Sequence, residues 1–453
     1  MDLAGQYREL LDQSFPQAEA EGCDPAQVAA IRQRAEALGA PSEAALVDEA
    51  RRREYLALID EVEALAVQEG FAYEEPSEFD EIVTERPEPL PGAAPVPGAA
   101  VLRDKVLGAW RGRCAGCMLG KPVEGRPRAV IEPLLRSVNA WPLDDYFPRI
   151  PELPEGVKFD QPPLHLNRGH IDRAVRDDDT DYPIAGLKVL ERKGRGFAPE
   201  DVADEWLASF PYGVVYTAER VAYRNLVNGL KPPQSARFRN PYREWIGAQI
   251  RADIWGWVNP GDPARAAEYA YRDACISHTK NGIYGELFFA AAIAQAFVTD
   301  DPGEVIEVGL AAIPANCRLA RAVEQVVEWC EGLETGDWER VWEQVWEQVT
   351  EFCGDMHWIH TINNAMMVVM AVLLGQGDFT RTISIAVMAG LDTDCNGATA
   401  GSLLGAMLGA GKLPAKWVEP LGDRLESAVS GEHTNAISEL AARTVRVASK
   451  RRN

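Results

Sequence analysis

The sequence lacks the features that would place the protein in a membrane or in an oxidising compartment. Its longest apolar run, residues 365–374, is about half of the ~18–20 residues that a membrane-spanning helix needs. Near the start, Asp2, Glu9 and Asp12 stand where a secretory signal would carry basic and then apolar residues, so we expect no such signal. Eight cysteines in 453 residues do not make a disulfide framework, and they favour a reducing, cytoplasmic location.

Basic residues are also scarce, since 46 Lys and Arg face 69 Asp and Glu, for a formal net charge of −23. A chain so acidic repels nucleic acid and anionic membranes, and we expect neither as a partner. The motifs of several enzyme classes are absent as well: no phosphate-binding loop, no dinucleotide fingerprint and no Gly-x-Ser-x-Gly elbow. Cys114 and Cys117 have redox spacing, but they lie in a glycine-striped helical pattern and are interpreted as buried structural thiols.

The acidic residues are concentrated at the beginning of the chain. Residues 1–100 hold 22 acids and seven arginines with no lysine, a net charge of −15, which leaves −8 for the other 353 residues. Helical patterns fill residues 1–72, and prolines cluster from Pro76 to Pro97. We therefore predict an acidic helical extension over 1–72, a Pro-rich extended linker over 73–100, and a catalytic domain over 101–453.

The pattern of the remaining chain predicts an all-α domain. Glycines recur every fourth residue from Gly108 to Gly120 and again from Gly401 to Gly409. Because each helical glycine costs about 1 kcal/mol against alanine, such a stripe indicates close approach by a neighbouring helix. We expect the two stripes to form two tightly packed, glycine-faced helices. The tryptophan stripe of residues 338–346 is interpreted as core.

Two acidic clusters are candidate sites, at residues 177–181 and 392–394. The first could equally be a helix start, where Asp is favoured. The second lies among apolar and small residues, with no Lys or Arg between Arg381 and Lys412, so a cation is the economical local counter-charge. Oxygen ligands of this kind suit Mg²⁺, Ca²⁺ or Mn²⁺ rather than zinc. Residues 392–397 also match the first half of an EF-hand loop, but Leu403 stands where that loop requires a glutamate, which argues against it.

The glycine stripe, Asp-Asp-Thr at 178–180 and Gly-Leu-Asp-Thr-Asp-Cys-Asn-Gly at 390–397 together resemble the ADP-ribosylglycohydrolase family. That family includes the dinitrogenase reductase-activating glycohydrolase and the ADP-ribosyl-acceptor hydrolases. The likeness covers roughly residues 101–415, including Gly-Lys-Pro-Val-Glu at 120–124 and a less specific segment at 277–286. The first hundred residues lie outside it.

The resemblance implies an orthogonal helical bundle with a site for one or two Mg²⁺ ions, Mn²⁺ or Ca²⁺ being alternatives. Asp178 and Asp179 match one pair of family ligands, and Asp392 and Asp394 match the other. Asp177 replaces the usual Thr or Ser, which would strengthen a site for a hard cation. Cys395 replaces the usual ligand Thr and offers a soft thiol in place of a hydroxyl, so one metal position is expected to be altered, weakened or lost. The candidate metal ligands are Asp177, Asp178, Asp179, Asp392, Asp394 and Cys395.

The chemistry implied is hydrolysis of a ribosyl bond through an oxocarbenium-like transition state. Metal ions can hold ribose hydroxyls and lower the pKa of a water molecule, and a carboxylate then removes its proton. Asp394 or Asp179 is the candidate base, and Glu124 matches the family acid that orients substrate or water. The candidate substrate-binding residues are Asn281, Tyr284, His357, His360, Asn363 and Asn396. Each of these could equally be a satisfied polar group of the core.

The expected function is that of a metal-dependent hydrolase acting on the N- or O-glycosidic bond of an ADP-ribosyl or ribosyl(-phosphate) conjugate. A small, nucleotide-derived substrate is favoured. The alternatives are a hydrolase that removes ADP-ribose from proteins and a non-catalytic ADP-ribose-binding module, for which Cys395 is the one hint. The sequence indicates neither the oligomeric state nor the role of the acidic extension.

Overall fold

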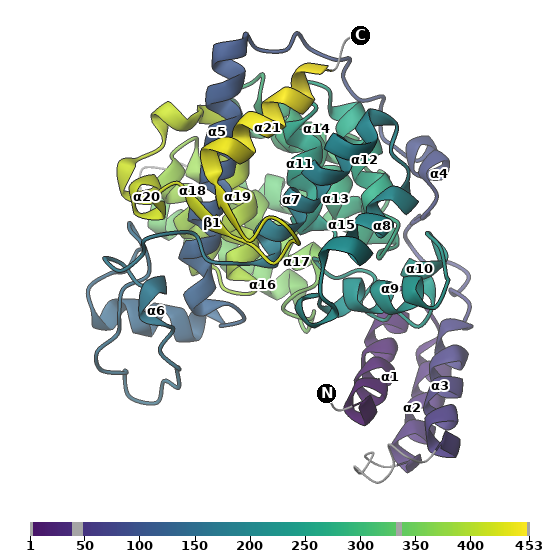
Figure 1. The fold of residues 1–453 in the computed structure, drawn as a ribbon. Coiled ribbons are helices and arrows are strands. Elements are labelled where there is room, and N and C mark those ends of the chain that lie inside the picture. Colours follow the sequence, from purple (N-terminus) through teal and green to yellow (C-terminus); the bar gives the residue numbers. More distant parts are fainter. Residues whose placement is uncertain (1–2, 39–48, 332–337, 451–453) are drawn as a thin grey trace.

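The computed structural model describes residues 3–38, 49–331 and 338–450, which are mostly helical (Figure 1). Within these ranges the strands are β1 (Arg424–Glu426) and β2 (Thr434–Ala436), which pair antiparallel with Leu425 opposite Asn435. The predicted all-α class is therefore confirmed, apart from this short hairpin. No helix of the described ranges is long and apolar enough to cross a membrane.

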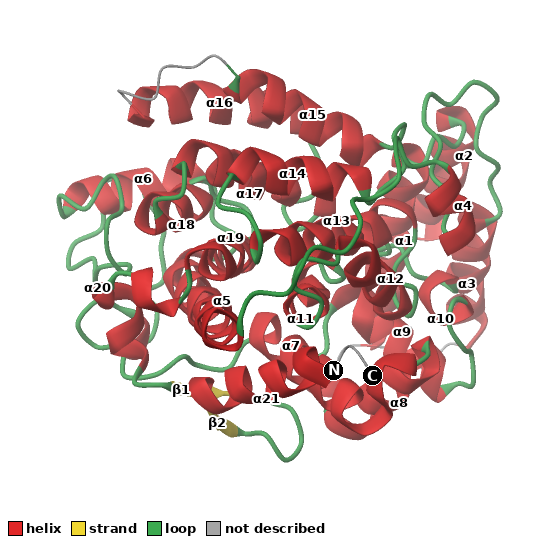
Figure 2. Cartoon of the chain, turned by 90° about the horizontal axis from the view of Figure 1, so that it is seen from above, coloured by secondary structure: helices red, strands yellow, loops and turns green. Residues whose placement is uncertain are grey.

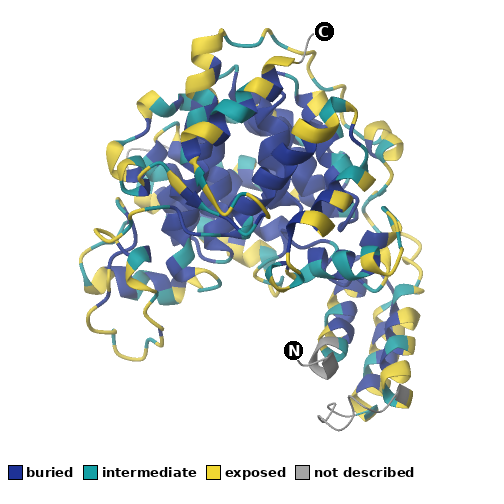
Figure 3. Ribbon diagram, viewed as in Figure 1, coloured by how far each residue is buried: buried dark blue, intermediate teal, exposed yellow. Residues whose placement is uncertain are grey.

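Two antiparallel helices, α5 (Ala99–Gly120) and α19 (Thr393–Leu408), lie side by side at the centre of the domain, where Figure 2 shows them nearly end-on. α13 (Lys280–Ala296) and α17 (Thr361–Gly375) are buried along almost their whole length (Figure 3). Helices that are apolar all round must lie inside a larger body. The other α-helices of the domain are α6 (Arg128–Ser137), α7 (Asp178–Lys193), α8 (Pro199–Ser209), α9 (Thr217–Val227), α10 (Gln234–Arg237), α11 (Ala252–Trp257), α12 (Pro263–Ala274), α14 (Pro302–Ala311), α15 (Arg318–Cys330), α16 (Trp338–Cys353), α18 (Phe379–Met388), α20 (Ala415–Val418) and α21 (Ile437–Ser449).

The acidic extension is a small group of helices packed against one side of the domain (Figure 1). It consists of α1 (Leu3–Ala20), α2 (Pro25–Leu38) and α3 (Glu49–Glu63). The extension has its own apolar cluster, which contains Leu11, Val28 and Ile59. This cluster continues onto Val221 and Trp245 of the domain. Burial of shared apolar surface therefore holds the extension in place.

The predicted linker is not a free extended chain. α4 (Phe79–Thr84) interrupts it, because Ile82 is buried in the main core and the Phe79 ring packs on Tyr271 with centroids 4.9 Å apart. Backbone hydrogen bonds tie the segment to the domain on either side of this helix: Glu74 N donates to Asn316 O at 2.9 Å, and Ala94 N donates to Gly261 O at 2.7 Å. The segment is thus a strap along the domain surface.

Candidate metal centre

The two glycine stripes bring the ends of α5 and α19 together. A Cβ atom at Gly112 would lie 2.0 Å from the carbonyl oxygen of Gly401, and one at Gly116 would lie 1.8 Å from that of Gly397. No side chain fits between backbones at this separation, so the predicted glycine-faced packing is confirmed. The contact fixes the C-terminus of α5 against the N-terminus of α19, where Thr393 Oγ1 donates to Gly120 O at 2.8 Å.

The acidic run at 392–394 forms the start of α19. Asp392 is its N-cap residue, and Asp394 lies in its first turn. The loop before it is held against the segment that follows α5, since Gly125 N donates to Leu391 O at 3.0 Å. This places Glu124 beside Asp392 and Asp394.

The other acidic run begins α7. Asp177 is the N-cap, and its Oδ1 accepts from Asp179 N at 3.0 Å. The helix-start interpretation of this run is therefore correct, but it does not account for Asp179, whose side chain is buried. Arg113 of α5 donates to Asp179 Oδ1 at 3.1 Å and to Asp253 Oδ2 at 2.6 Å. Cys395 Sγ lies 3.1 Å from Asp179 Oδ2.

Three groups of candidate ligands converge from α5, α7 and α19. In each group one ligand atom of every residue lies within 4.8 Å of the others, and Asp179 and Asp394 are shared between groups. The groups are Cys117, Asp177 and Asp179; Asp179, Asp394 and Cys395; and Glu124, Asp392 and Asp394. Residues far apart in the sequence thus form one continuous acidic centre.

The carboxyl groups of this centre disfavour one another's ionised form. Burial raises the pKa of Asp394 and Asp392 well above the ordinary value, and neighbouring carboxylates raise it further. Burial also raises the pKa of Asp179, and the positive charge of Arg113 offsets this increase only in part. Burial would also raise the pKa of Asp177, but its ion pair with Lys121 and the hydrogen bonds from Asp179 together hold the pKa below the usual value.

This donor set fits a hard divalent cation. Arg113 is shared with Asp253, and Lys121 pairs with Asp177, so these two cations leave Asp392, Asp394 and Glu124 without a full counter-charge. Asp392 and Asp394 are buried, and buried carboxylates without a full counter-charge must be protonated or bound to a cation. Clustered oxygen donors suit Mg²⁺, Mn²⁺ or Ca²⁺, whereas the thiols of Cys117 and Cys395 are softer donors at one side of the centre.

The ADP-ribosylglycohydrolase family model matches residues 99–453, from the first residue of α5 onward. The chain belongs to the ADP-ribosylglycohydrolase family. A solved structure described as "ADP-ribosylglycohydrolase-related protein complex" is similar with a TM-score of 0.50 and 20% identity, covering 77% of this chain and 99% of that one. At this identity the similarity concerns the fold alone. None of the curated proteins compared matches the chain.

This member of the family gathers five of its six candidate metal ligands into the three groups. The exception is Asp178, which lies beside them in the first turn of α7, is only partly buried and belongs to none of the groups. Cys117, interpreted from the sequence as a buried structural thiol, is buried, and its Sγ lies within 4.8 Å of ligand atoms of Asp177 and Asp179. It stands one helical turn before Lys121, which follows α5 and pairs with Asp177.

Asn281 and Tyr284 contact the strap rather than the residues of the acidic centre. Asn281 Nδ2 donates to Glu75 and Glu244, each at 2.8 Å, and the Tyr284 hydroxyl donates to Pro76 O. Both polar groups therefore have hydrogen-bond partners within the protein. This agrees with the alternative that they are polar residues of the core, and their role in substrate binding stays a prediction.

His357 and His360 line a cavity of about 290 Å³ between α1 and the domain. The His357 ring stacks on Trp245 with centroids 4.2 Å apart. His360 caps α17, and burial lowers its pKa to about 4. Asn363 Nδ2 donates to His357 O at 2.9 Å. The pair thus faces the extension, while a role in substrate binding stays a prediction.

The residue that connects this segment to the acidic centre is Asn364, which the sequence analysis did not single out. It is fully buried; its Nδ2 donates to His360 O at 2.8 Å, and its Oδ1 accepts from Asp392 N at 3.2 Å and from Asn396 Nδ2 at 2.8 Å. Two adjacent asparagines ahead of a long apolar run were the signal available, because a buried amide must find partners.

Replacing Asn364 with alanine is expected to lower the free energy of unfolding by about 2–3 kcal/mol, since several buried partners lose their hydrogen bonds. It should also weaken Mg²⁺ binding, because the backbone of Asp392 loses its acceptor. Urea denaturation and calorimetric Mg²⁺ titration measure the two effects. Asn228→Ala at the exposed end of α9 is the matched control and should change neither.

Proposed function

We propose that this chain is a metal-dependent hydrolase that cleaves the N- or O-glycosidic bond of an ADP-ribosyl or ribosyl(-phosphate) conjugate. We favour a small, nucleotide-derived substrate. The observation that carries the proposal is the meeting of Glu124, Asp179, Asp392 and Asp394 at the contact of α5, α7 and α19. Membership of the ADP-ribosylglycohydrolase family supports the type of bond.

The ion would be held by Asp179, Asp392 and Asp394, with Asp177, Asp178 and Cys395 beside them. Bound Mg²⁺ supplies orientation of ribose hydroxyls and a lower pKa for a water molecule. Asp394 or Asp179 then accepts the proton of the attacking water. Glu124 is the more exposed carboxyl of its group, so it is suited to orient the substrate or the water from the open side.

One observation favours a second candidate function, a binding module without turnover. Cys395 places a thiol 3.1 Å from Asp179 Oδ2, where the family usually has a threonine hydroxyl. A softer donor there would weaken one metal position. Such a module would keep affinity for ADP-ribose and release no product.

A hydrolysis screen separates these functions. The purified chain would be incubated with Mg²⁺ and ADP-ribosyl-arginine peptides, ADP-ribosyl-serine peptides, free nucleotides or ribosyl metabolites, with Asp392→Asn as the blank. Release of ribose or ADP-ribose from the small molecules, absent in the blank, is the expected result. Release from the peptides would make the chain a protein de-ADP-ribosylating enzyme. Metal-dependent ADP-ribose binding without release would overturn the hydrolase in favour of the binding module.

Lys121 is expected to limit the number or the affinity of the bound ions. Its ammonium group pairs with Asp177 beside Cys117 and thus supplies a positive charge where a further cation would otherwise bind. Lys121→Met should therefore bind Mn²⁺, used as a paramagnetic probe, about tenfold more tightly or in greater number, since the like charge is removed. Metal-free Lys121→Met should melt at a lower temperature than the parent, because Asp177 loses its counter-ion. An unchanged Mn²⁺ titration would contradict this role.

A further inference from the structure

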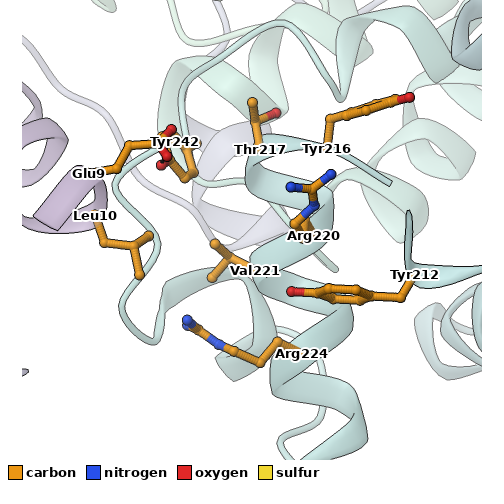
Figure 4. Close-up of a pocket in the computed structure, with 9 residues that line it drawn as sticks. All are labelled: Glu9, Leu10, Tyr212, Tyr216, Thr217, Arg220, Val221, Arg224 and Tyr242. Atoms are coloured by element: carbon orange, nitrogen blue, oxygen red, sulfur yellow. Dashed lines mark hydrogen bonds between the residues drawn. The ribbon is translucent and has the colours of Figure 1, made fainter. Parts of the chain in front are cut away.

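A second cavity, of about 150 Å³, lies at the seam between the extension and the domain (Figure 4). α1 forms one wall with Glu9 and Leu10, and α9 with the segment before it forms the other. We call it the seam cavity. The residues of α1 lie outside the part of the chain that the family model matches, and none of the candidate metal ligands lines this space.

Two arginines of the seam cavity have no acidic partner. Arg220 Nε donates to Val215 O at 2.6 Å, while Arg224 reaches Asn225 Oδ1 and Arg239 O at 3.4 and 3.5 Å. These acceptors are uncharged, and in the part of the chain that the structure describes neither guanidinium forms an ion pair. Burial lowers the pKa of Arg224. Among the residues that line the cavity, Glu9 is the single acid.

The arrangement of these side chains suits a bound anion. Arg220 and Arg224 are one turn apart on α9, and both side chains line the cavity. Figure 4 shows the Tyr212 ring reaching toward this space, and the Arg220 guanidinium lies 5.8 Å from its centroid. A stacked guanidinium is held in orientation with its outer N–H groups available for a ligand.

Glu9 distinguishes the seam cavity from a site that binds only a simple anion. Its Oε1 accepts a hydrogen bond from the Tyr242 hydroxyl at 3.1 Å, and the carboxylate retains further acceptor capacity. A ligand hydroxyl can donate to it, whereas a bare anion would be repelled. The cavity therefore offers two cations at one end and a hydroxyl acceptor at the other.

We propose that the seam cavity binds a small phosphorylated molecule with free hydroxyl groups, such as a sugar phosphate. Arg220 and Arg224 hold the phosphate, and Glu9 accepts a hydrogen bond from a hydroxyl group. Phosphate is favoured over carboxylate because its dianion balances both guanidinium groups and offers three oxygens to their N–H donors. This site goes beyond the proposed hydrolase function, since it uses none of the carboxylates of the acidic centre.

Isothermal titration calorimetry of the full chain in EDTA tests the proposal. EDTA removes divalent metal ions, so metal-dependent binding at the acidic centre does not contribute to the signal. The probes are ribose 5-phosphate, inorganic phosphate and ribose. Ribose 5-phosphate is expected to bind more tightly than inorganic phosphate, and ribose not at all. In Arg220→Gln/Arg224→Gln the affinity for ribose 5-phosphate should fall by at least about tenfold, as expected for lost charge-assisted hydrogen bonds.

The matched control removes two positive charges elsewhere. Arg321→Gln/Arg446→Gln changes two exposed arginines, one on α15 and one on α21, and should bind within about twofold of the parent if bulk charge is not the cause. Glu9→Gln should bind inorganic phosphate as well as the parent or better, but lose the preference for ribose 5-phosphate. Should the double variant not fold, Arg224→Lys replaces it. This variant keeps the positive charge but loses the paired N–H donors of the guanidinium group, and it is expected to lose a part of the affinity for ribose 5-phosphate.

No binding of any probe up to about 10 mM would overturn the proposal, since that is weaker than a charge-paired phosphate gives. Equal affinity of the parent and the double glutamine variant would overturn it as well. Neither result bears on the hydrolysis screen, which depends on Mg²⁺ and on Asp392.

Discussion

In the Asp394→Asn variant, kcat at saturating Mg²⁺ is expected to fall by about 10²–10⁴-fold, the usual contribution of a general base. Asparagine occupies the same volume and keeps one oxygen, but it cannot accept the proton of the attacking water. Asp394 is one of the two carboxyls that are shared between groups, and it alone links Cys395 to Glu124 and Asp392, so no neighbouring acid replaces it without moving. The measurement is a steady-state assay on the substrate identified in the hydrolysis screen, with Mg²⁺ binding followed in parallel.

Asp204→Asn is the control, because this aspartate is exposed on α8 and carries the same charge. It should retain the kcat of the parent. Full turnover in an Asp394→Asn protein that still binds Mg²⁺ would remove Asp394 as the base and leave Asp179 as the candidate. A variant that binds no Mg²⁺ would show that Asp394 acts first as a ligand, and the split between kcat and metal affinity distinguishes the two roles.

Gly116→Ala is expected to lower the free energy of unfolding by about 3 kcal/mol or more, which belongs to the severe end of single substitutions. The new Cβ would lie 1.8 Å from the carbonyl oxygen of Gly397, so α5 and α19 must separate along their shared face. In an unconstrained helix the same change would stabilise by about 1 kcal/mol, so the sign of the effect is diagnostic. Thermal and urea denaturation measure it.

Gly196→Ala provides the comparison, since a Cβ there meets no atom within 4 Å and the backbone conformation is accessible to alanine. Its unfolding free energy should stay within about 0.5 kcal/mol of the parent. Because the contact of α5 and α19 also positions Asp392 and Asp394, any folded Gly116→Ala protein should bind Mg²⁺ more weakly. A stable variant with unchanged Mg²⁺ affinity would contradict the role assigned to the glycine stripe.

The helical class and the central helix pair were predictable because each produces a periodic pattern of residues in the sequence. Glycine every fourth residue is costly in a lone helix, so the stripe itself indicated a partner at backbone contact. The linker was predicted less well. Its prolines and glycines indicated an extended chain, yet α4 forms within it because Ile82 finds a place in the main core, and tertiary burial overrides local composition.

The acidic runs were visible as candidate ligands because several carboxylates stood close together in the chain. Their partners were not visible in the same way. Arg113 reaches Asp179 and Asp253 from another helix, and Asn364 supports Asp392 from 28 positions away. Such pairings depend on which helices pack against each other, and a single sequence does not predict that packing.

The sequence by itself determined a helical protein of the ADP-ribosylglycohydrolase type with an acidic extension and two clusters of hard ligands, because composition, periodicity and short-range spacing are local properties. The tertiary structure alone decided that Lys121 neutralises Asp177, that Asn281 and Tyr284 contact the strap, and that two arginines of α9 line one cavity with Glu9 of α1. These contacts join segments tens to hundreds of residues apart. Their charges and hydrogen bonds act through space, and only the folded chain sets those distances.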